Sequence, residues 1–120
     1  MQGQKKVLIV EDERPLAHAL ELKLQREGFA TLVARSGQEA LDAVQKDVFD
    51  VMLLDLILPG VDGFQVLQHL GTLPKKPIVF VLSNLSQHED EERVMALGAR
   101  KYFVKSDTPL SVIVEEVKGI

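Results

Sequence analysis

The chain has 120 residues, of which 46% are hydrophobic and 27% charged, the composition of one globular domain with a buried core. Its 18 acidic and 14 basic residues give a net charge of −4, which argues against direct binding to nucleic acid. The sequence has no cysteine, which excludes disulfides and cysteine nucleophiles, and it shows neither a signal peptide nor an apolar run near the ~20 residues of a membrane span. We therefore expect a soluble, cytoplasmic protein.

Short apolar runs alternate along the chain with longer segments whose apolar residues have helical spacing. The runs are 7–10, 29–34, 51–54, 78–82 and 102–104. Most are continuous rather than alternating, which is typical of strands buried on both faces of a parallel sheet. The helical stripes lie within 16–24, 40–44, 64–70, 94–97 and 110–117. Five β-α units in sequence, joined by right-handed crossovers, predict an α/β doubly wound fold.

Polar residues mark the expected beginnings of three helices. Ser36 and Ser86 each open the S-x-x-E pattern of a capping box. Thr108 precedes Pro109, which indicates an N-cap followed by proline at the first helical position.

Polar side chains directly follow four of the predicted strands. Glu11 and Asp12 follow the first strand, Asp55 the third, Ser83 the fourth and Lys105 the fifth. In an open parallel sheet the carboxyl ends of the strands meet at one edge, where ligands bind. Asp12 taken alone is explained as a cap of the next helix, but Asp55 closes an otherwise apolar strand. We therefore interpret the set as a functional site.

The residue types in this set indicate a particular chemistry. Clustered carboxylates repel one another and need a cation, and oxygen ligands with open positions suit Mg²⁺. A carboxylate can also act as a nucleophile and form an aspartyl phosphate. In such a site Lys105 would pair with phosphoryl oxygens, and the Ser83 hydroxyl would hydrogen-bond to another. The pattern therefore predicts phosphoryl transfer to Asp55.

The motifs at these strand ends also resemble those of a known family. They are residues 7–13 (VLIVEDE), 36–41 (SGQEAL), 54–56 (LDL), 59–63 (PGVDG), 82–83 (LS), 98–99 (GA) and 102–105 (YFVK). In this order they resemble the receiver domain of bacterial two-component response regulators, a CheY-like domain, over essentially the whole chain. The resemblance implies a flavodoxin-like (βα)5 fold with a parallel five-stranded sheet in the order 2-1-3-4-5. It also implies that residues 1–120 form a single receiver domain, with no output domain in this chain.

The resemblance implies which residues hold the phosphoryl group and the metal. Asp55 would be the phosphoacceptor. Mg²⁺ would be bound directly by Asp12 and Asp55 and by the backbone carbonyl of Ile57, and through a water by Glu11.

The resemblance also implies how the domain signals. Ser83 and Lys105 would be catalytic residues that contact the phosphoryl group, and Ser83 would move together with Tyr102 as a switch. The domain would catalyse only its own phosphorylation and dephosphorylation, with the phosphohistidine of a sensor histidine kinase or phosphotransfer protein as donor. The phosphate would change a surface that contacts a downstream protein target or a missing output domain. Because residues 99–101 lack the acidic pair of dimerising relatives, we expect a monomer.

Three residues depart from the family pattern and are potential modulators of the site. Ser106 follows Lys105 where the family has a proline, often after a cis bond. A cis bond before a non-proline residue costs about 3–4 kcal/mol, so we expect a trans bond here. Asn84 stands where a small residue is usual, and its amide either approaches the phosphoryl site or faces outward. Ile57 cannot orient a hydrolytic water, which predicts slow loss of phosphate.

Two other classes of protein fit these residues less well, and a third remains open. A phosphohydrolase of the haloacid-dehalogenase type would have an aspartate two residues past the nucleophile, where this chain has Ile57. A flavin-binding module would have a Ser/Thr/Gly-rich loop after the first strand, where this chain has acids. A binding module that keeps the fold without phosphorylation remains open, because Asn84 and Ser106 depart from the family pattern.

Overall fold

The computed structural model describes residues 3–85 and 88–120, in which strands and helices alternate along the chain. In order they are β1 (Lys6–Val10), α1 (Arg14–Arg26), β2 (Ala30–Ala34), α2 (Gly37–Lys46), β3 (Val51–Asp55), α3 (Gly63–Leu70), β4 (Ile78–Ser83), α4 (His88–Ala96), β5 (Lys101–Val104) and α5 (Leu110–Lys118). A short 3₁₀ turn, Lys105–Asp107, lies between β5 and α5. This is the succession of β-α units that the apolar pattern predicts.

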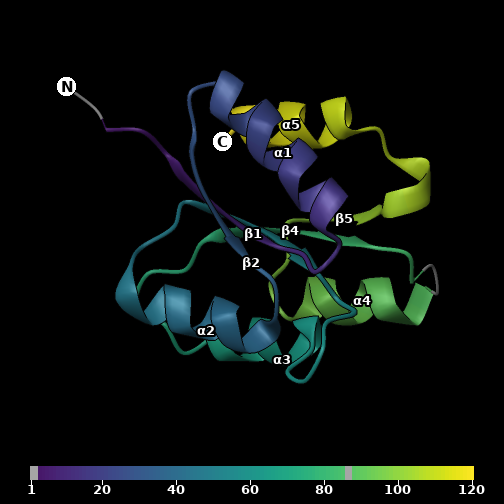
Figure 1. The fold of residues 1–120 in the computed structure, drawn as a ribbon. Helices are drawn as coiled ribbons and strands as arrows, with labels where there is room; N and C mark the ends of the chain where they lie inside the picture. The colour runs from purple at the N-terminus through teal and green to yellow at the C-terminus, as the bar shows by residue number, and fades with distance from the viewer. Residues whose placement is uncertain (1–2, 86–87) are drawn as a thin grey trace.

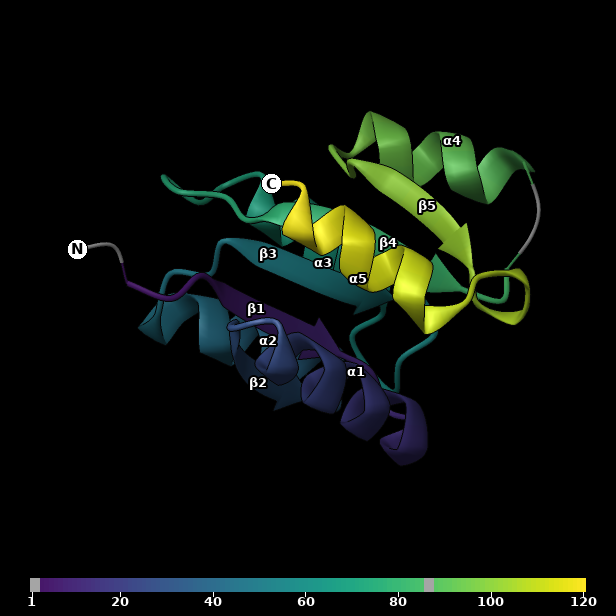
Figure 2. The ribbon, with the colours of Figure 1, turned by 90° about the horizontal axis from the view of Figure 1, so that it is seen from above.

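The strands form one parallel sheet in the order β2-β1-β3-β4-β5, as predicted. Helices α1 and α5 cover one face and α2, α3 and α4 cover the other, so the sheet is the middle of three layers (Figure 1). Seen from above, the strands run the same way, and their carboxyl ends reach one edge (Figure 2). The chain passes from β1 to β2 on one side and then to β3 on the other, so the topological switch point lies between β1 and β3.

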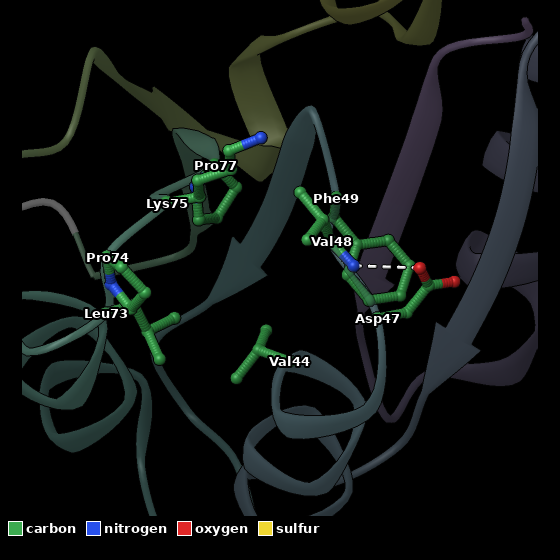
Figure 3. A pocket seen from close by; sticks show the side chains of 8 residues that line it. All are labelled: Val44, Asp47, Val48, Phe49, Leu73, Pro74, Lys75 and Pro77. Atoms are coloured by element: carbon green, nitrogen blue, oxygen red, sulfur yellow. Dashed lines mark hydrogen bonds between the residues drawn. The ribbon is translucent and has the colours of Figure 1, made fainter.

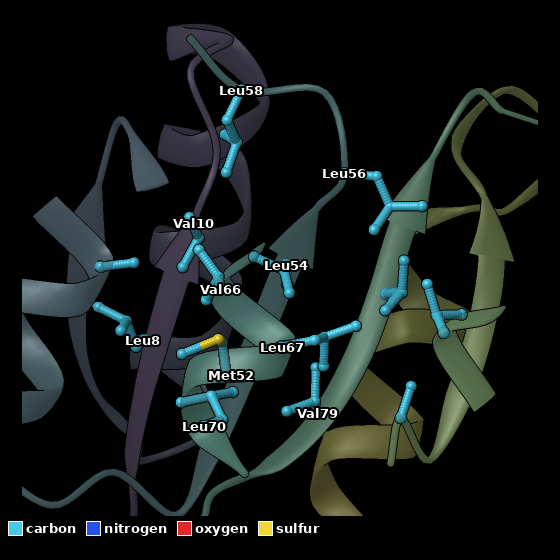
Figure 4. Packing of buried hydrophobic residues seen from close by; sticks show 14 of the residues in the cluster. Leu8, Val10, Met52, Leu54, Leu56, Leu58, Val66, Leu67, Leu70 and Val79 are labelled. Carbon is cyan, nitrogen blue, oxygen red and sulfur yellow. The ribbon is translucent and has the colours of Figure 1, made fainter. Parts of the chain in front are cut away.

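Successive residues of the central strands face opposite helical layers. Leu8 and Met52 belong to the core beneath α2, α3 and α4, whereas Ile9 and Leu53 belong to the core beneath α1 and α5. Figure 4 shows the first of these cores, in which Leu67 of α3 lies over the sheet. Burying one such side chain contributes roughly 1.5–3 kcal/mol, so the two cores hold the sheet rigid beneath the loops at its carboxyl edge.

The two outer strands are less buried than their apolar sequences indicate. β1, β3 and β4 are almost entirely buried, as predicted, but Leu32 of β2 is 48% exposed, and residues 102–104 of β5 are only partly buried. The helices cover the middle of the sheet and leave its margins to solvent. The prediction of strands buried on both faces is therefore correct for the central strands and wrong for the edge strands.

The ends of the helices follow the predicted caps with one correction. Ser36 caps α2, and its Oγ accepts a hydrogen bond from the Glu39 N–H at 3.1 Å. α5 begins one residue later than predicted: Pro109 occupies the N-cap position, and the Thr108 hydroxyl instead donates to the Val104 carbonyl at 2.8 Å. The cap expected at residue 86 lies outside the described residues. Within the described ranges, α1 is the longest helix at 13 residues, and no helix is long and apolar enough to cross a membrane.

Candidate functional site

The carboxyl edge of the sheet gathers the acidic side chains expected there. Glu11 and Asp12 lie in the loop after β1, and Asp55 is the last residue of β3, which pairs with β1. One carboxylate oxygen from each of these residues lies within 4.8 Å of the others, and we call the three the acidic cluster. Glu11 and Asp55 are buried, at 2% and 4% exposure, whereas Asp12 is exposed. The cluster is therefore anchored in the sheet and open to solvent on one side.

Lys105 reaches the acidic cluster from the 3₁₀ turn after β5. Its Nζ lies 2.7 Å from Glu11 Oε1, 2.9 Å from Asp55 Oδ2 and 3.7 Å from Glu13 Oε2, and its side chain is 10% exposed. The ion pairs join residues that are far apart in the sequence, since Lys105 and Asp55 are 50 positions apart. The predicted convergence of these strand ends is thus present in the structure.

Burial and charge shift the pKa values of the two innermost groups. Burial raises the pKa of Glu11 above its usual 4.5; the contact with Lys105 and the hydrogen bond from the Glu13 N–H offset part of this rise, and the Asp55 carboxylate adds to it. Burial lowers the pKa of Lys105, but its contacts with Glu11 and Asp55 outweigh burial, and the pKa is raised above 10.5. Lys105 is therefore charged at neutral pH.

The acidic cluster has the donor atoms that a hard cation requires. Three carboxylates face one ammonium, so negative charge is in excess. Glu11 Oε1 is buried and ion-paired with Lys105, but among the described residues it has no hydrogen bond of normal geometry. An all-oxygen set with one exposed member suits Mg²⁺, which keeps several of its waters. The residues present therefore fit the expected metal.

The Asp55 carboxylate is held at both of its oxygens. Oδ1 accepts a hydrogen bond from the Ile57 N–H at 3.1 Å, and Oδ2 accepts one from Lys105. The start of α3 packs closely behind: a Cβ on Gly63 would lie 2.5 Å from the Asp55 carbonyl oxygen, so glycine is required there. The Ile57 side chain is 56% exposed and brings no polar group to the site. Asp55 is thus presented in one fixed orientation.

Ser83 and Tyr102 come from the neighbouring strands β4 and β5. Ser83 is completely buried, and its Oγ accepts a hydrogen bond from the Leu85 N–H at 3.1 Å. The Tyr102 hydroxyl is also buried, and no group within the described residues hydrogen-bonds to it with normal geometry. Burial, and then the Asp90 carboxylate, raise the pKa of Tyr102, while the nearby Ser83 hydroxyl offsets part of this shift. The tyrosine ring therefore lies inward, beside the predicted switch hydroxyl.

Asn84 and Ser106 contact each other, an arrangement that the sequence analysis did not anticipate. Asn84 Oδ1 accepts a hydrogen bond from the Ser106 N–H at 3.1 Å, and both residues are exposed. The Lys105–Ser106 bond is trans, as expected. Asn84 thus faces outward, as one of the two alternatives had it, but its amide is engaged with the loop after β5.

Backbone donors complete the site, and the sequence analysis missed them. The Ile57 N–H bonds to Asp55 Oδ1, and the Glu13 N–H bonds to Glu11 Oε2 at 3.0 Å. Every residue except proline has an N–H, so residue type does not show which one is used. The available signal is an acid at the end of a strand, since its side chain can accept from the backbone two residues on.

A separate hollow of about 280 Å³ lies at the opposite edge of the sheet (Figure 3). It is lined mostly by apolar side chains from the segments before β3 and β4, among them Phe49, Leu73 and Pro77. Its acidic member, Asp47, accepts a hydrogen bond from the Val48 N–H at 2.8 Å. The hollow is therefore distinct from the acidic cluster.

An aspartate ending a central parallel strand, with two acids beside it, a hydroxyl from the next strand and a lysine that follows the strand beyond, is the arrangement typical of the receiver domains of two-component signalling. The family model described as the response regulator receiver domain matches residues 7–117. The chain belongs to this family.

Individual relatives agree with this assignment. The chain is 34% identical over 99 residues to the uncharacterized transcriptional regulatory protein YkoG of Bacillus subtilis (strain 168). That match covers 82% of this chain and 43% of the relative, so the chain spans less than half of the relative's length. The receiver domain of the Francisella response regulator 1452 is 27% identical with a TM-score of 0.88, covering 96% of this chain and 94% of that one. The signal receiver domain of a signal transduction histidine kinase from Syntrophus aciditrophicus is 28% identical with a TM-score of 0.85, covering 96% and 88%.

Proposed function

We propose that this chain is the phosphoacceptor switch of a two-component system and that Asp55 receives the phosphoryl group. The observation that carries the proposal is the environment of Asp55. One carboxylate oxygen is held by Lys105 Nζ at 2.9 Å, and oxygens of Glu11 and Asp12 lie within 4.8 Å. The donor is a phosphohistidine on a sensor histidine kinase or phosphotransfer protein.

The reaction uses the Asp55 carboxylate as a nucleophile. A carboxylate oxygen attacks the phosphorus, the phosphorus–nitrogen bond of the donor breaks, and its electron pair returns to the imidazole. The product is an acyl phosphate. It is lost when water attacks the phosphorus, which restores the carboxylate and releases inorganic phosphate. The Ile57 N–H and Lys105 orient the nucleophile for this attack, so little rearrangement is needed.

The acidic cluster would hold Mg²⁺ through Glu11, Asp12 and Asp55, with the carbonyl of Ile57 as a further ligand. Bound there, the ion supplies positive charge to the phosphoryl oxygens during transfer. The exposed carboxylate of Asp12 leaves the metal position open to solvent, and the buried Glu11 is the fixed member of the cluster.

Two side chains respond to the phosphoryl group. Lys105 moves its ion pair from the carboxylate to a phosphoryl oxygen, which is the larger negative charge. The Ser83 hydroxyl leaves the Leu85 N–H and donates to another phosphoryl oxygen, and the buried Tyr102 hydroxyl follows it. The surface of α4, β5 and α5 around these residues changes as a result.

The activity extends no further than the domain's own phosphorylation and dephosphorylation. Residues 1–120 act as one receiver unit and as a monomer in the cytoplasm, without contacting nucleic acid or membrane. The changed surface contacts a downstream protein or an output domain. A phosphohydrolase that turns over separate substrates is disfavoured, because Ile57 presents an exposed apolar side chain where a general acid would stand.

Incubation with acetyl phosphate and Mg²⁺ tests the proposal. The intact mass of the wild type should rise by one phosphoryl group, and Asp55→Asn should stay unmodified. Asp50→Asn is the matched control, because Asp50 is an exposed acid at the other end of β3, and it should be modified like the wild type. An unmodified wild type, or equal modification of Asp55→Asn, would contradict the proposal and favour a binding module that only keeps the fold.

A further inference from the structure

A side chain that the proposed chemistry does not use joins two loops at the carboxyl edge. Asn84, in the loop after β4, accepts through Oδ1 the N–H of Ser106, in the 3₁₀ turn after β5, at 3.1 Å. Ser106 directly follows Lys105, whose Nζ is paired with Asp55 and Glu11. The hydrogen bond therefore acts on the backbone of the residue that supplies the site with its ammonium.

Among the residues that the structure describes, Thr108 anchors the turn that carries Lys105 on its C-terminal side. The turn has 3 residues, and the N–H of Thr108 reaches the Lys105 carbonyl at the long distance of 3.5 Å. The Thr108 hydroxyl donates to the Val104 carbonyl at 2.8 Å. Asn84 supplies the anchor on the side of β4. Without this hydrogen bond the Ser106 N–H would bond to water instead. The backbone that positions the Lys105 side chain would then be less constrained.

The register of the sheet explains why the two loops meet. β4 and β5 pair with Ser83 opposite Val104, so the residues that follow each strand lie side by side. The start of the segment after β4, residues 83–85, is held by a local hydrogen bond, because Ser83 Oγ accepts the N–H of Leu85. Asn84 sits between these two positions, on a backbone held at both ends, and reaches across to the neighbouring turn.

We propose that Asn84 is a positioning residue for Lys105: its amide oxygen holds the Ser106 N–H and thereby sets the reach of the Lys105 ammonium to Asp55. The inference rests on the proposed phosphoryl transfer to Asp55. Asn84 acts through the backbone of the Lys105 turn and not by touching the phosphoryl group.

Three substitutions distinguish this positioning role from a purely steric effect of the Asn84 side chain at the edge of the site. Asn84→Leu keeps the shape of the side chain but removes the acceptor. Asn84→Ala removes the acceptor and also opens space, and Asn84→Asp retains an acceptor oxygen. The matched control is Gln25→Leu, which removes an exposed amide that donates to Thr31 Oγ1 at 2.9 Å near the end of α1.

Each protein is treated with acetyl phosphate and Mg²⁺, and its phosphorylation is followed by mass. NMR records the exchange of the Ser106 N–H and the titration of Lys105. We expect Asn84→Leu and Asn84→Ala to be phosphorylated roughly three- to tenfold more slowly than the wild type, the effect of one hydrogen bond. Both should lose protection of the Ser106 N–H, and the pKa of Lys105 should fall toward 10.5. Asn84→Asp should keep the protection, and Gln25→Leu should match the wild type throughout.

The outcomes distinguish a failure of the positioning role of Asn84 from a failure of the proposed phosphoryl transfer. If Asn84→Ala is phosphorylated faster than the wild type and Asn84→Leu at the same rate, Asn84 acts only through its size, and the positioning role is refuted. Unchanged rates with an unchanged Lys105 titration refute it as well. If the wild type itself takes up no phosphate, the proposed function fails. The Ser106 exchange and the Lys105 titration then still decide whether Asn84 positions the lysine.

Discussion

Replacing Lys105 with methionine removes the ammonium that neutralises the acidic cluster and keeps much of the apolar stem. The lysine Nζ lies 2.7 Å from Glu11 Oε1 and 2.9 Å from Asp55 Oδ2, and the acidic side chains are 2% and 5% exposed. Removing one partner of a buried ion pair costs about 3–5 kcal/mol. Because water can enter from the open side at Asp12, we expect Lys105→Met to lose about 2–4 kcal/mol of unfolding free energy, somewhat less than a fully enclosed pair.

The loss should depend on pH in a direction that the structure specifies. Burial raises the pKa of Glu11 above 4.5, and the ion pair with Lys105 limits that rise. In Lys105→Met this restraint is gone, so the pKa of Glu11 rises further. A carboxyl whose folded pKa exceeds its unfolded value binds more protons when folded, so stability falls as pH rises through that window. The variant should therefore approach the wild type near pH 5 and differ most near pH 8.

Urea unfolding in the presence of a chelator measures this effect at both pH values. The midpoint should shift while the slope stays constant, which marks a change of stability alone. Adding Mg²⁺ should restore part of the loss at the higher pH, because the ion can take the place of the missing charge.

Lys101→Met is the matched control for the lysine at the site. Lys101 also pairs with a glutamate, Glu116, but at the surface, where its side chain is 51% exposed. Such pairs contribute about 0–1 kcal/mol, so little change is expected. If Lys105→Met is no less stable than Lys101→Met, or if its loss is the same at both pH values, Lys105 does not neutralise a buried Glu11.

Three further predictions concern the neighbours of Asp55. Mg²⁺ at ten times its dissociation constant should stabilise the wild type by about 1.4 kcal/mol in thermal or urea unfolding; an equal gain in Asp12→Asn would show that the ion binds elsewhere. Gly63→Ala places a Cβ 2.5 Å from the Asp55 carbonyl and should cost roughly 1–3 kcal/mol in thermal unfolding. Gly119→Ala, whose nearest atom is 3.5 Å away, should be close to neutral. Ile57→Asn should speed the decay of the phosphorylated protein, followed by mass, and an unchanged decay rate would refute the role given to Ile57.

The sequence predicted the fold well because the strands carry a strong signal. The runs that form β1, β3 and β4 are wholly apolar, which few structures other than a covered parallel sheet can accommodate. The same pattern overstated the burial of Leu32, because an edge strand has the composition of its neighbours but a helical cover over only part of its width. Residue types therefore predict where a strand lies in the sequence, whereas the position of the strand in the sheet determines how much of it is buried.

The site was predictable to the extent that side chains define it. Glu11, Asp55 and Lys105 were found because each ends or directly follows a strand, and all parallel strands end at one edge. The bonds that orient these groups come partly from the backbone, such as the Ile57 N–H on Asp55. Such bonds depend on the course of the loops, which residue types alone do not specify.

The Asn84–Ser106 hydrogen bond depends on the register of the strands, which the sequence did not predict. Each residue departs from the family pattern when considered alone, and the two are 22 positions apart. What joins them is the pairing of β4 and β5, in which Ser83 lies opposite Val104. A shift of this register by one residue would set Asn84 against a different part of the turn and turn the β5 side chains to the other face. The parallel sheet follows from the alternation of β-α units and its strand order from the family resemblance, but register depends on packing across the whole sheet. Two unusual residues can therefore be matched partners in the fold although nothing in their spacing connects them.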